Sequence, residues 1–329
     1  MPVPQRIAVT LPDERGVHET VELAKWAESA GFDDIWFADN SGIDSLTLAA
    51  SVSMITERVR IGTAIIPVFT RTPAVLASTT HVLNQVSGGR FILGLGSSSE
   101  FMMVNWNGQV FEKPRTRVKE TVQLVKSMLA GEKSDFDGET VSSHGYKQPP
   151  LDYQPVYMAA LREKMLETAA EVADGVIINL FPRSALPKIM KHIRIGAERA
   201  GKNLEDMEIV CRHQVVVTDD PDGARDTFRA RYAPYYATPV YNKFLAWAGF
   251  EDAAATIEAG WAARDRTKTT SALVDGLVDE IAAIGSEDAV QERIREYADL
   301  GITTHIISCC SEADLQRTYE AFSADQFAF

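Results

Sequence analysis

The chain has 329 residues, of which 45% are hydrophobic and 24% charged, a composition typical of a globular protein with a large core. Its formal net charge of −13 argues against nucleic-acid binding, which depends on neutralising phosphates with basic side chains. No stretch approaches the roughly 18 uninterrupted apolar residues of a membrane helix, and the first residues show no signal-peptide pattern, so we predict a cytoplasmic protein with no membrane partner.

Short β-branched runs alternate along the chain with stretches of helical periodicity. The runs are apolar on both faces, as parallel strands covered by helices on both sides are. Eight such units predict a single (β/α)8 barrel, or TIM barrel, over residues 1–329, and the alternative is a doubly wound sheet. The predicted strands are Arg6–Pro12, Asp34–Asp39, Val59–Pro67, Phe91–Gly96, Pro155–Ala160, Gly175–Asn179, Met207–Val217 and Thr304–Cys309, and the predicted helices begin near His18, Ser45, Thr72, Arg115, Arg162, Ser184, Asp222 and Ser311.

Two segments interrupt this alternation. Residues 134–154, which contain the turn dipeptide Asp137–Gly138, predict a hairpin or a loop before the fifth strand. Residues 232–286 are predicted to be helical and lie between the seventh and eighth strands. Insertions in barrels usually cover the face that holds the active site, and the alternative is a structural helical layer or a dimer contact.

Cysteine and histidine patterns argue against disulfides and metal. Cys211 and the adjacent pair Cys309–Cys310 lie in apolar, strand-like context, which predicts buried thiols. The six histidines show no HxH or HExxH spacing, so we expect no zinc site. The chain also has no recognisable serine or cysteine nucleophile motif. This pattern fits an enzyme whose reactivity resides in an organic cofactor.

The active site of a TIM barrel lies at the carboxyl ends of its strands. Gly94–Ser99 leads from a strand into a loop of small residues, whose N–H and hydroxyl donors allow close approach to a ligand ring or phosphate. The alternative is an ordinary loop, because the third glycine of the dinucleotide fingerprint is missing. Ala159–Lys164 passes directly from strand to helix, so free N–H groups with Arg162 and Lys164 predict an anion site, and the alternative is a pair of solvated cations.

Several segments, in the same order, resemble the luciferase-like superfamily of flavin monooxygenases and deazaflavin-dependent oxidoreductases. The resemblance is strongest to the branch near methylenetetrahydromethanopterin reductase, and it covers nearly the whole chain. It implies a TIM-barrel enzyme. The most specific segments are Ala27–Trp36, Val59–Ala74, Gly88–Gly96, Trp106–Pro114 and Pro155–Gly175.

The resemblance implies which residues contact the ring of the cofactor. Asp39 matches a residue that contacts the deazaflavin ring in the coenzyme F420 branch, and Asn40 stands where some members have histidine. The family places a non-prolyl cis peptide at the position of Ala64–Ile65, where in relatives it presses on the central ring. Ile66 follows along the same strand end.

Other strand ends are implied to hold the rest of the cofactor. Many relatives have glycine and proline where this chain has Leu-Arg-Glu, and this departure makes Arg162 a candidate for binding the phosphate tail. The remaining contacts implied by the resemblance are Gly96, Ser97 and Ser98 beside the ring, and Ala160, Leu161, Arg162 and Glu163 at the tail.

The implied activity is hydride transfer between coenzyme F420 and a small organic substrate. A deazaflavin carries a carbon in place of the flavin N5 atom, so it moves hydride and does not activate oxygen. An FMN-dependent luciferase-like monooxygenase has the same barrel and is the alternative, and a non-catalytic cofactor-binding relative is a third reading.

Relatives in this superfamily are commonly dimers, and the second and third predicted helices carry a wide apolar stripe. We therefore expect a homodimer that buries these helices, and the alternative is ordinary packing against the barrel. The stripe consists of Leu46, Leu48, Val52, Ile55, Val75, Leu76, Val82 and Leu83.

Overall fold

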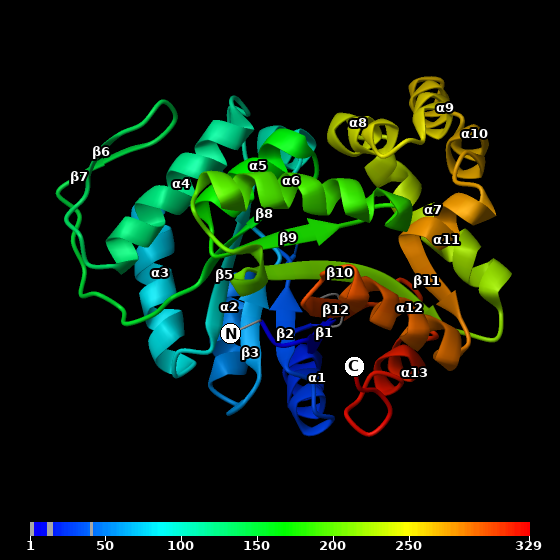
Figure 1. The fold of residues 1–329 in the computed structure, drawn as a ribbon, viewed down its shortest axis with the longest axis horizontal. Coiled ribbons are helices and arrows are strands. Elements are labelled where there is room, and N and C mark those ends of the chain that lie inside the picture. The colour runs from blue at the N-terminus through cyan, green and yellow to red at the C-terminus, as the bar shows by residue number, and fades with distance from the viewer. Residues whose placement is uncertain (1–2, 12–15, 40–41) are drawn as a thin grey trace.

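The computed structural model describes residues 3–11, 16–39 and 42–329, in which parallel strands close into a barrel (Figure 1). The barrel strands in order are β1 (Arg6–Thr10), β2 (Asp34–Phe37), β3 (Arg60–Thr63), β5 (Phe91–Gly96), β8 (Val156–Ala159), β9 (Gly175–Asn179), β10 (Glu208–Val217) and β12 (Thr304–Ser308). The ring closes because β10 pairs with both β9 and β12, and β12 pairs with β1. The prediction of a TIM barrel is confirmed, and the doubly wound alternative is wrong.

The predicted third strand is divided. β3 ends at Thr63, and the chain resumes strand pairing at β4 (Ile66–Pro67), which pairs with the end of β5. The two residues between them, Ala64 and Ile65, belong to neither strand, but their backbones still bond to Phe37 and Asp39 at the end of β2. The other predicted strands are confirmed to within two residues at each end.

Helices cover the outside of the barrel. The third helix begins where threonine and proline predict, because the Thr72 hydroxyl accepts a hydrogen bond from the backbone of Val75 at 3.5 Å and Pro73 occupies the first position. None of the helices in the described ranges is long and apolar enough to cross a bilayer. The flanking helices are α1 (Val17–Ser29), α2 (Ser45–Ser53), α3 (Pro73–Val86), α4 (Pro114–Leu129), α5 (Glu163–Val172), α6 (Leu186–Arg199), α7 (Pro221–Tyr236), α12 (Glu287–Asp299) and α13 (Leu315–Glu320).

Three helix predictions need correction. A 3₁₀ turn precedes α6, which starts at Leu186 and not at Ser184, and α13 starts at Leu315, four residues after Ser311. The predicted helix starts do not include α12, because one helix was assigned to each strand, whereas several helices follow β10. Ser286 caps α12 by accepting a hydrogen bond from the backbone of Ala289 at 3.4 Å.

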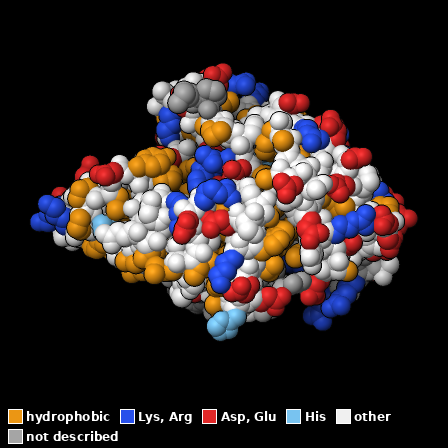
Figure 2. Space-filling view, turned by 90° about the horizontal axis from the view of Figure 1, so that it is seen from below, with side chains coloured by type: hydrophobic (Ala, Val, Ile, Leu, Met, Phe, Trp, Pro, Cys, Tyr) orange, Lys and Arg blue, Asp and Glu red, His pale blue; other side chains and the backbone are white. Residues whose placement is uncertain are grey.

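The first insertion is the predicted hairpin. Its strands, β6 (Asp135–Asp137) and β7 (Ser142–His144), are antiparallel and project from the side of the barrel (Figures 1 and 2). The Glu120 carboxylate on α4 accepts hydrogen bonds from the backbone N–H groups of Glu139 at 2.7 Å and Thr140 at 2.8 Å. These bonds tie the turn of the hairpin to the barrel.

The second insertion is mostly helical, but it also contains a strand. Its elements after α7 are α8 (Pro239–Trp247), α9 (Glu251–Ala262), α10 (Arg266–Ser271), α11 (Asp275–Ile281) and β11 (Ala282–Gly285). The expectation that this segment contributes no strand is wrong, since β11 pairs in parallel with the last four residues of β10. The reason is the length of β10, which continues past the end of β9 and leaves an open edge for another strand.

The insertion packs on the carboxyl-terminal rim of the barrel, as predicted. Tyr236 donates a hydrogen bond to the backbone oxygen of Leu180, just after β9, at 2.8 Å, and Tyr232 donates to the Gln214 side chain on β10 at 2.6 Å. Both tyrosines belong to a buried apolar cluster with Val216 at the end of β10. The α7–α11 segment therefore covers the β9–β10 side of the mouth (Figure 1).

Two layers of side chains fill the interior below the mouth. At the amino-terminal end, Arg60 binds the carboxylates of Asp34 and Glu208 at 2.6 to 3.0 Å. Above it lies an apolar layer in which Trp36 faces Gly62, where a Cβ atom would lie 2.4 Å from the indole ring. This layer consists of Ala8, Trp36, Ile92, Tyr157, Ile177, Val210 and Ile306. Because these layers close the lumen, a ligand has access to the barrel only from the carboxyl-terminal mouth.

Candidate active site

The floor of the mouth is apolar and consists of small or branched side chains. Ala64, Ile65 and Ala159 pack on the apolar layer of the lumen, and all three remain partly exposed. The peptide bond between Ala64 and Ile65 is cis, at the bond where the resemblance places it. Gly96 lies against Ile65, and a Cβ atom at this glycine would come within 2.9 Å of the Ile65 side chain. The glycine is required because Ile65 occupies the space beside it.

Ile66 differs from its neighbour. Its side chain is fully buried in the core between the sheet and the helices, and its backbone is paired with Leu95 of β5. Of the expected contacts along this strand end, Ile66 therefore offers no side chain to a ligand. A residue after a bulge turns to the opposite face of the sheet, and this alternation separates Ile65 from Ile66.

Asp39 lies beside the floor and is held by an ion pair that the sequence analysis missed. Its backbone N–H donates to the carbonyl of Ile65 at 3.2 Å, and its carboxylate accepts from Arg71 Nη1 at 2.6 Å. Arg71 also binds Asp44. Burial lowers the pKa of the Arg71 guanidinium, but the two carboxylates outweigh that effect and raise it. The expected neighbour Asn40 lies outside the described residues.

The loop after β5 presents hydroxyl groups at the mouth. Ser97 and Ser98 are both half-buried, and Ser98 has a left-handed backbone with φ of 59°. The Ser97 hydroxyl donates to the backbone oxygen of Ser98 at 3.2 Å, so both lone pairs of its oxygen remain free to accept. The loop continues into a π-helical turn, Met102–Trp106, in which Trp106 is 54% exposed.

The junction between β8 and α5 forms an uncapped helix start. Arg162 is the N-cap residue of α5, and no side chain caps the helix. Arg162 has no acidic partner among the residues that the structure describes, and Lys164 is exposed. Ala160 is buried and its N–H already bonds to Ile177, while one carboxylate oxygen of Glu163 is buried without a partner. Of the expected tail residues, Leu161 and Arg162 are therefore the best placed to contact a ligand.

A second group of polar side chains lies on β9 and β10, on the other side of the mouth. Of these residues the sequence analysis named only Asn179, as the last residue of a predicted strand. Arg212 and Gln214 alternate with outward-facing residues on β10, and Arg212 pairs in register with Asn179 on β9. Burial raises the pKa of the Tyr241 phenol on α8 to about 12, and Arg212 and Asn179 lie close enough to counter this effect in part. The sequence does contain a signal for Arg212 and Gln214: two polar residues, two positions apart, interrupt an apolar strand and therefore point to the same face of the sheet.

The two polar groups face each other because of strand order. In the barrel, β3 and β10 are four strands apart, so each lies opposite the other. Asp39 and Ile65 therefore stand on one side of the mouth, and Asn179 and Arg212 on the other.

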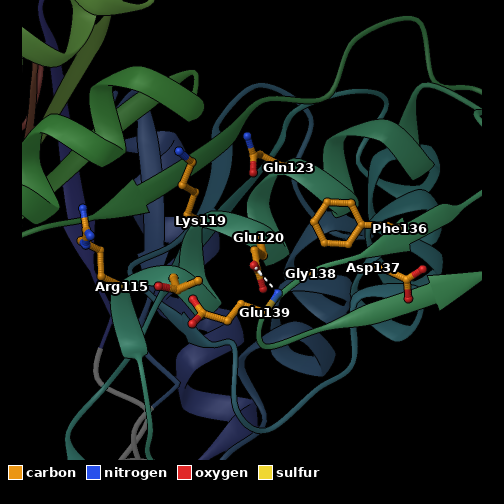
Figure 3. A pocket seen from close by; sticks show the side chains of 9 residues that line it. Arg115, Lys119, Glu120, Gln123, Phe136, Asp137, Gly138 and Glu139 are labelled. Atoms are coloured by element: carbon orange, nitrogen blue, oxygen red, sulfur yellow. Dashed lines mark hydrogen bonds between the residues drawn. The ribbon is translucent and has the colours of Figure 1, made fainter.

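A separate cavity lies outside the mouth. It has a volume of about 450 Å³ and lies between α4 and the hairpin, where Arg115 and Lys119 line it together with Glu120 (Figure 3). None of the residues expected at the cofactor lines it. Its acidic side chain Glu120 is already bound to the hairpin backbone.

Histidines and cysteines do not form a metal centre within the described part of the chain, where no cluster of three or more potential ligands occurs. His213 and His305 are buried outside the lumen, with their ring nitrogens 3.1 Å apart. Burial lowers the pKa of His305 to about 3 and that of His213 well below its usual value. Cys211 and Cys310 are buried thiols as predicted, whereas Cys309 is half-buried.

A mouth with an apolar floor, partly exposed serine hydroxyls and an uncapped helix start is typical of TIM-barrel enzymes that work through an organic cofactor. The chain belongs to the luciferase-like monooxygenase family, which it matches over residues 2–304.

Individual relatives cover almost the whole chain. The 5,10-methylenetetrahydromethanopterin reductase of Methanolobus tindarius is 31% identical over 295 residues, which are 87% of this chain and 89% of the relative. The F420-dependent glucose-6-phosphate dehydrogenase of Rhodococcus erythropolis is 28% identical, with coverage of 95% and 94%. The solved structure of the coenzyme F420 dependent tetrahydromethanopterin reductase of Methanopyrus kandleri superposes with a TM-score of 0.81 at 21% identity, over 97% of each chain. The chain is an oxidoreductase.

Proposed function

We propose that this chain is a coenzyme F420-dependent oxidoreductase that transfers a hydride between the deazaflavin and a small organic substrate. When bound, the deazaflavin supplies the hydride chemistry. The proposal is supported by the Rhodococcus enzyme and the Methanopyrus structure, which are both named as F420-dependent. The protein residues then have to hold the ring, bind its tail and position the substrate.

The floor of the mouth fits a planar ring, and this observation carries the proposal. Ile65 and Ala159 offer an apolar surface, and Gly96 beside them leaves no side chain to obstruct it. None of the described side chains of the floor is charged, so a ring that packs on it contacts apolar protein surface. The hydroxyls of Ser97 and Ser98 lie at its edge, where they can bind polar atoms of the ring.

Asp39 has a positioning role in this proposal. Its N–H bond to Ile65 fixes it beside the floor, and the 2.6 Å bond from Arg71 orients the carboxylate. An oriented carboxylate can accept hydrogen bonds from polar N–H or O–H groups of a bound ring.

The start of α5 fits the negatively charged tail. Its first N–H groups have no side-chain cap, and the positive end of the helix dipole favours an anion. Arg162 adds a charge that no described carboxylate neutralises. Glu163 stands in the same turn and opposes the anion in part, so Arg162 is the residue on which tail binding depends.

Equilibrium titration with coenzyme F420 and with FMN, followed by absorbance and fluorescence, tests the proposal. We expect tighter binding of coenzyme F420. Tighter binding of FMN would instead assign the FMN-dependent monooxygenase activity, and binding of neither cofactor would contradict both assignments.

A further inference from the structure

Three arginines that are enclosed by the protein have carboxylate partners, and Arg212 does not. Arg60 binds two carboxylates, Arg71 binds two, and Arg225 binds Asp279 at 2.9 Å. Arg212 makes no hydrogen bond and no ion pair with any residue of the described ranges, and its Nε atom is buried. An unpaired buried donor is unfavourable by about 1–3 kcal/mol, and more when it is charged.

No carboxylate of the described residues pairs with Arg212. Its charge acts on the phenols of Tyr232, Tyr241 and Tyr319, and burial raises the pKa of each of them. These phenols are therefore neutral at pH 7. The guanidinium stands at the mouth as a cation among neutral aromatic side chains.

Each of two neighbours of Arg212 has one side-chain atom without a partner among the described residues, although Tyr232 binds the first and Tyr241 the second. Gln214, two residues along β10, is 2% exposed, and its amide nitrogen has no acceptor because only its oxygen is bound, by Tyr232. The side-chain oxygen of Asn179, in register with Arg212 on β9, has no donor. Two adjacent donors, one of them a cation, and one acceptor thus remain unsatisfied together on the same side of the mouth.

We propose that Arg212, Gln214 and Asn179 form the substrate anchor, and that the substrate carries an oxyanion with a hydroxyl beside it. The guanidinium and the Gln214 amide bind the oxyanion, and Asn179 accepts the bond from the hydroxyl. This inference rests on the proposed function, because the anchor lies opposite Ile65 and thus across the mouth from the surface proposed for the ring. Tyr232 on α7 binds Gln214, and Tyr241 on α8 lies beside Asn179 and Arg212, so tyrosines of the second insertion adjoin the anchor.

Calorimetric titration of the purified protein, with and without coenzyme F420, tests the anchor with four probes. Mandelate has a carboxylate and a hydroxyl, phenylacetate lacks the hydroxyl, mandelamide lacks the charge, and phenyl phosphate replaces the carboxylate. We expect mandelate to bind at least tenfold more tightly than mandelamide and several-fold more tightly than phenylacetate. Tighter binding of phenyl phosphate than of mandelate would assign the oxyanion to a phosphate. Equal binding of mandelate and mandelamide would overturn the proposal.

Variants separate the anchor from a structural role. Arg212→Met should abolish the preference for mandelate over mandelamide, while Arg194→Met, on the exposed face of α6, should leave it unchanged. Because Arg212 has no partner to lose, Arg212→Met should also unfold at the same or a higher temperature than the unliganded wild type. A lower unfolding temperature of Arg212→Met would show that Arg212 has a structural role.

The two proposals fail in different ways. If the cofactor does not bind but the mandelate preference persists in the protein alone, the proposed function is wrong and the anchor stands. If Arg212→Met weakens coenzyme F420 binding at least tenfold, Arg212 belongs to the cofactor site and the anchor is wrong.

Discussion

The Asp39 carboxylate accepts a hydrogen bond of 2.6 Å from Arg71, and both side chains are about 85% enclosed by the protein. The two residues are 32 positions apart and belong to loops after neighbouring strands. Replacing Arg71 with methionine removes the bond that orients Asp39, so we expect coenzyme F420 to bind roughly tenfold more weakly, a loss of about 1.4 kcal/mol.

Asp44→Asn is the control for this variant. Asp44 binds the same guanidinium from its solvent side and is 45% exposed, so its replacement should change affinity by less than about twofold, as surface ion pairs do. An Arg71→Met protein with unchanged affinity would show that the ion pair serves the loop alone.

Arg162 should determine the affinity for the cofactor tail. Arg162→Ala removes a charge-assisted bond of about 1.5–3 kcal/mol, which corresponds to a roughly 10- to 150-fold higher dissociation constant. The rate of hydride transfer at saturating cofactor should hardly change. Lys164→Ala is the matched control. Lys164 lies two residues after Arg162 and is exposed, so this variant should bind the cofactor with wild-type affinity. If both variants bind the cofactor as tightly as the wild type does, both cations are only solvated.

Arg60 should stabilise the barrel without affecting the mouth. It binds two buried carboxylates at the opposite end of the lumen, so Arg60→Met leaves like charges unpaired and should lower the free energy of unfolding by about 3–5 kcal/mol. Chemical denaturation measures this change. Adding Asp34→Asn and Glu208→Gln should recover part of the loss, and cofactor affinity should stay constant in all variants. A weaker cofactor complex would contradict the separation of the two ends.

The buried histidines should make the protein less stable in mild acid. The lowered pKa values of His213 and His305 mean that the unfolded chain binds more protons than the folded one below about pH 6.5. The free energy of unfolding should therefore fall as the pH drops from 6.5 to 5, by up to about 1.4 kcal/mol per pH unit for each histidine.

His305→Gln should flatten this dependence, whereas the exposed His144→Gln should not. If the His305 variant does not fold, the ring proton shift of His305 in the wild type provides the second measurement. If the NMR chemical shift of the His305 ring at pH 5 is that of a protonated imidazole, buried neutral histidine does not explain the pH dependence.

Self-association should involve the end of α2 and the outer face of α3. Val75 and Val82 of the predicted apolar stripe are 49% and 53% exposed, and Met54 beside the stripe is 70% exposed. We propose a homodimer through this face, for which light scattering should give twice 36.2 kDa. Val82→Glu should give the monomer, and Val274→Glu, equally exposed at the start of α11, should not. A monomeric wild type at micromolar concentration would rule the dimer out.

The sequence by itself determined the local features. Thr72 and Pro73 mark a helix start because a cap and its proline act within one turn. Continuous apolar runs predict parallel strands, and parallel strands with helices between them place the site at their carboxyl ends. Position along the chain is therefore sufficient to nominate Ala160 to Glu163 and the serine loop as candidate site residues.

Only the tertiary structure decided which distant residues meet. Arg71 reaches Asp39, and Arg212 stands in register with Asn179, because strand pairing brings together residues about thirty positions apart. β11 forms because β10 extends beyond the end of β9 and offers an open edge. The relative lengths of two strands cannot be obtained from the local sequence pattern of either one. The burial of Ile66 in the core likewise depends on tertiary structure. After the bulge at Ala64–Ile65, pairing with β5 determines the face of the sheet to which the Ile66 side chain points.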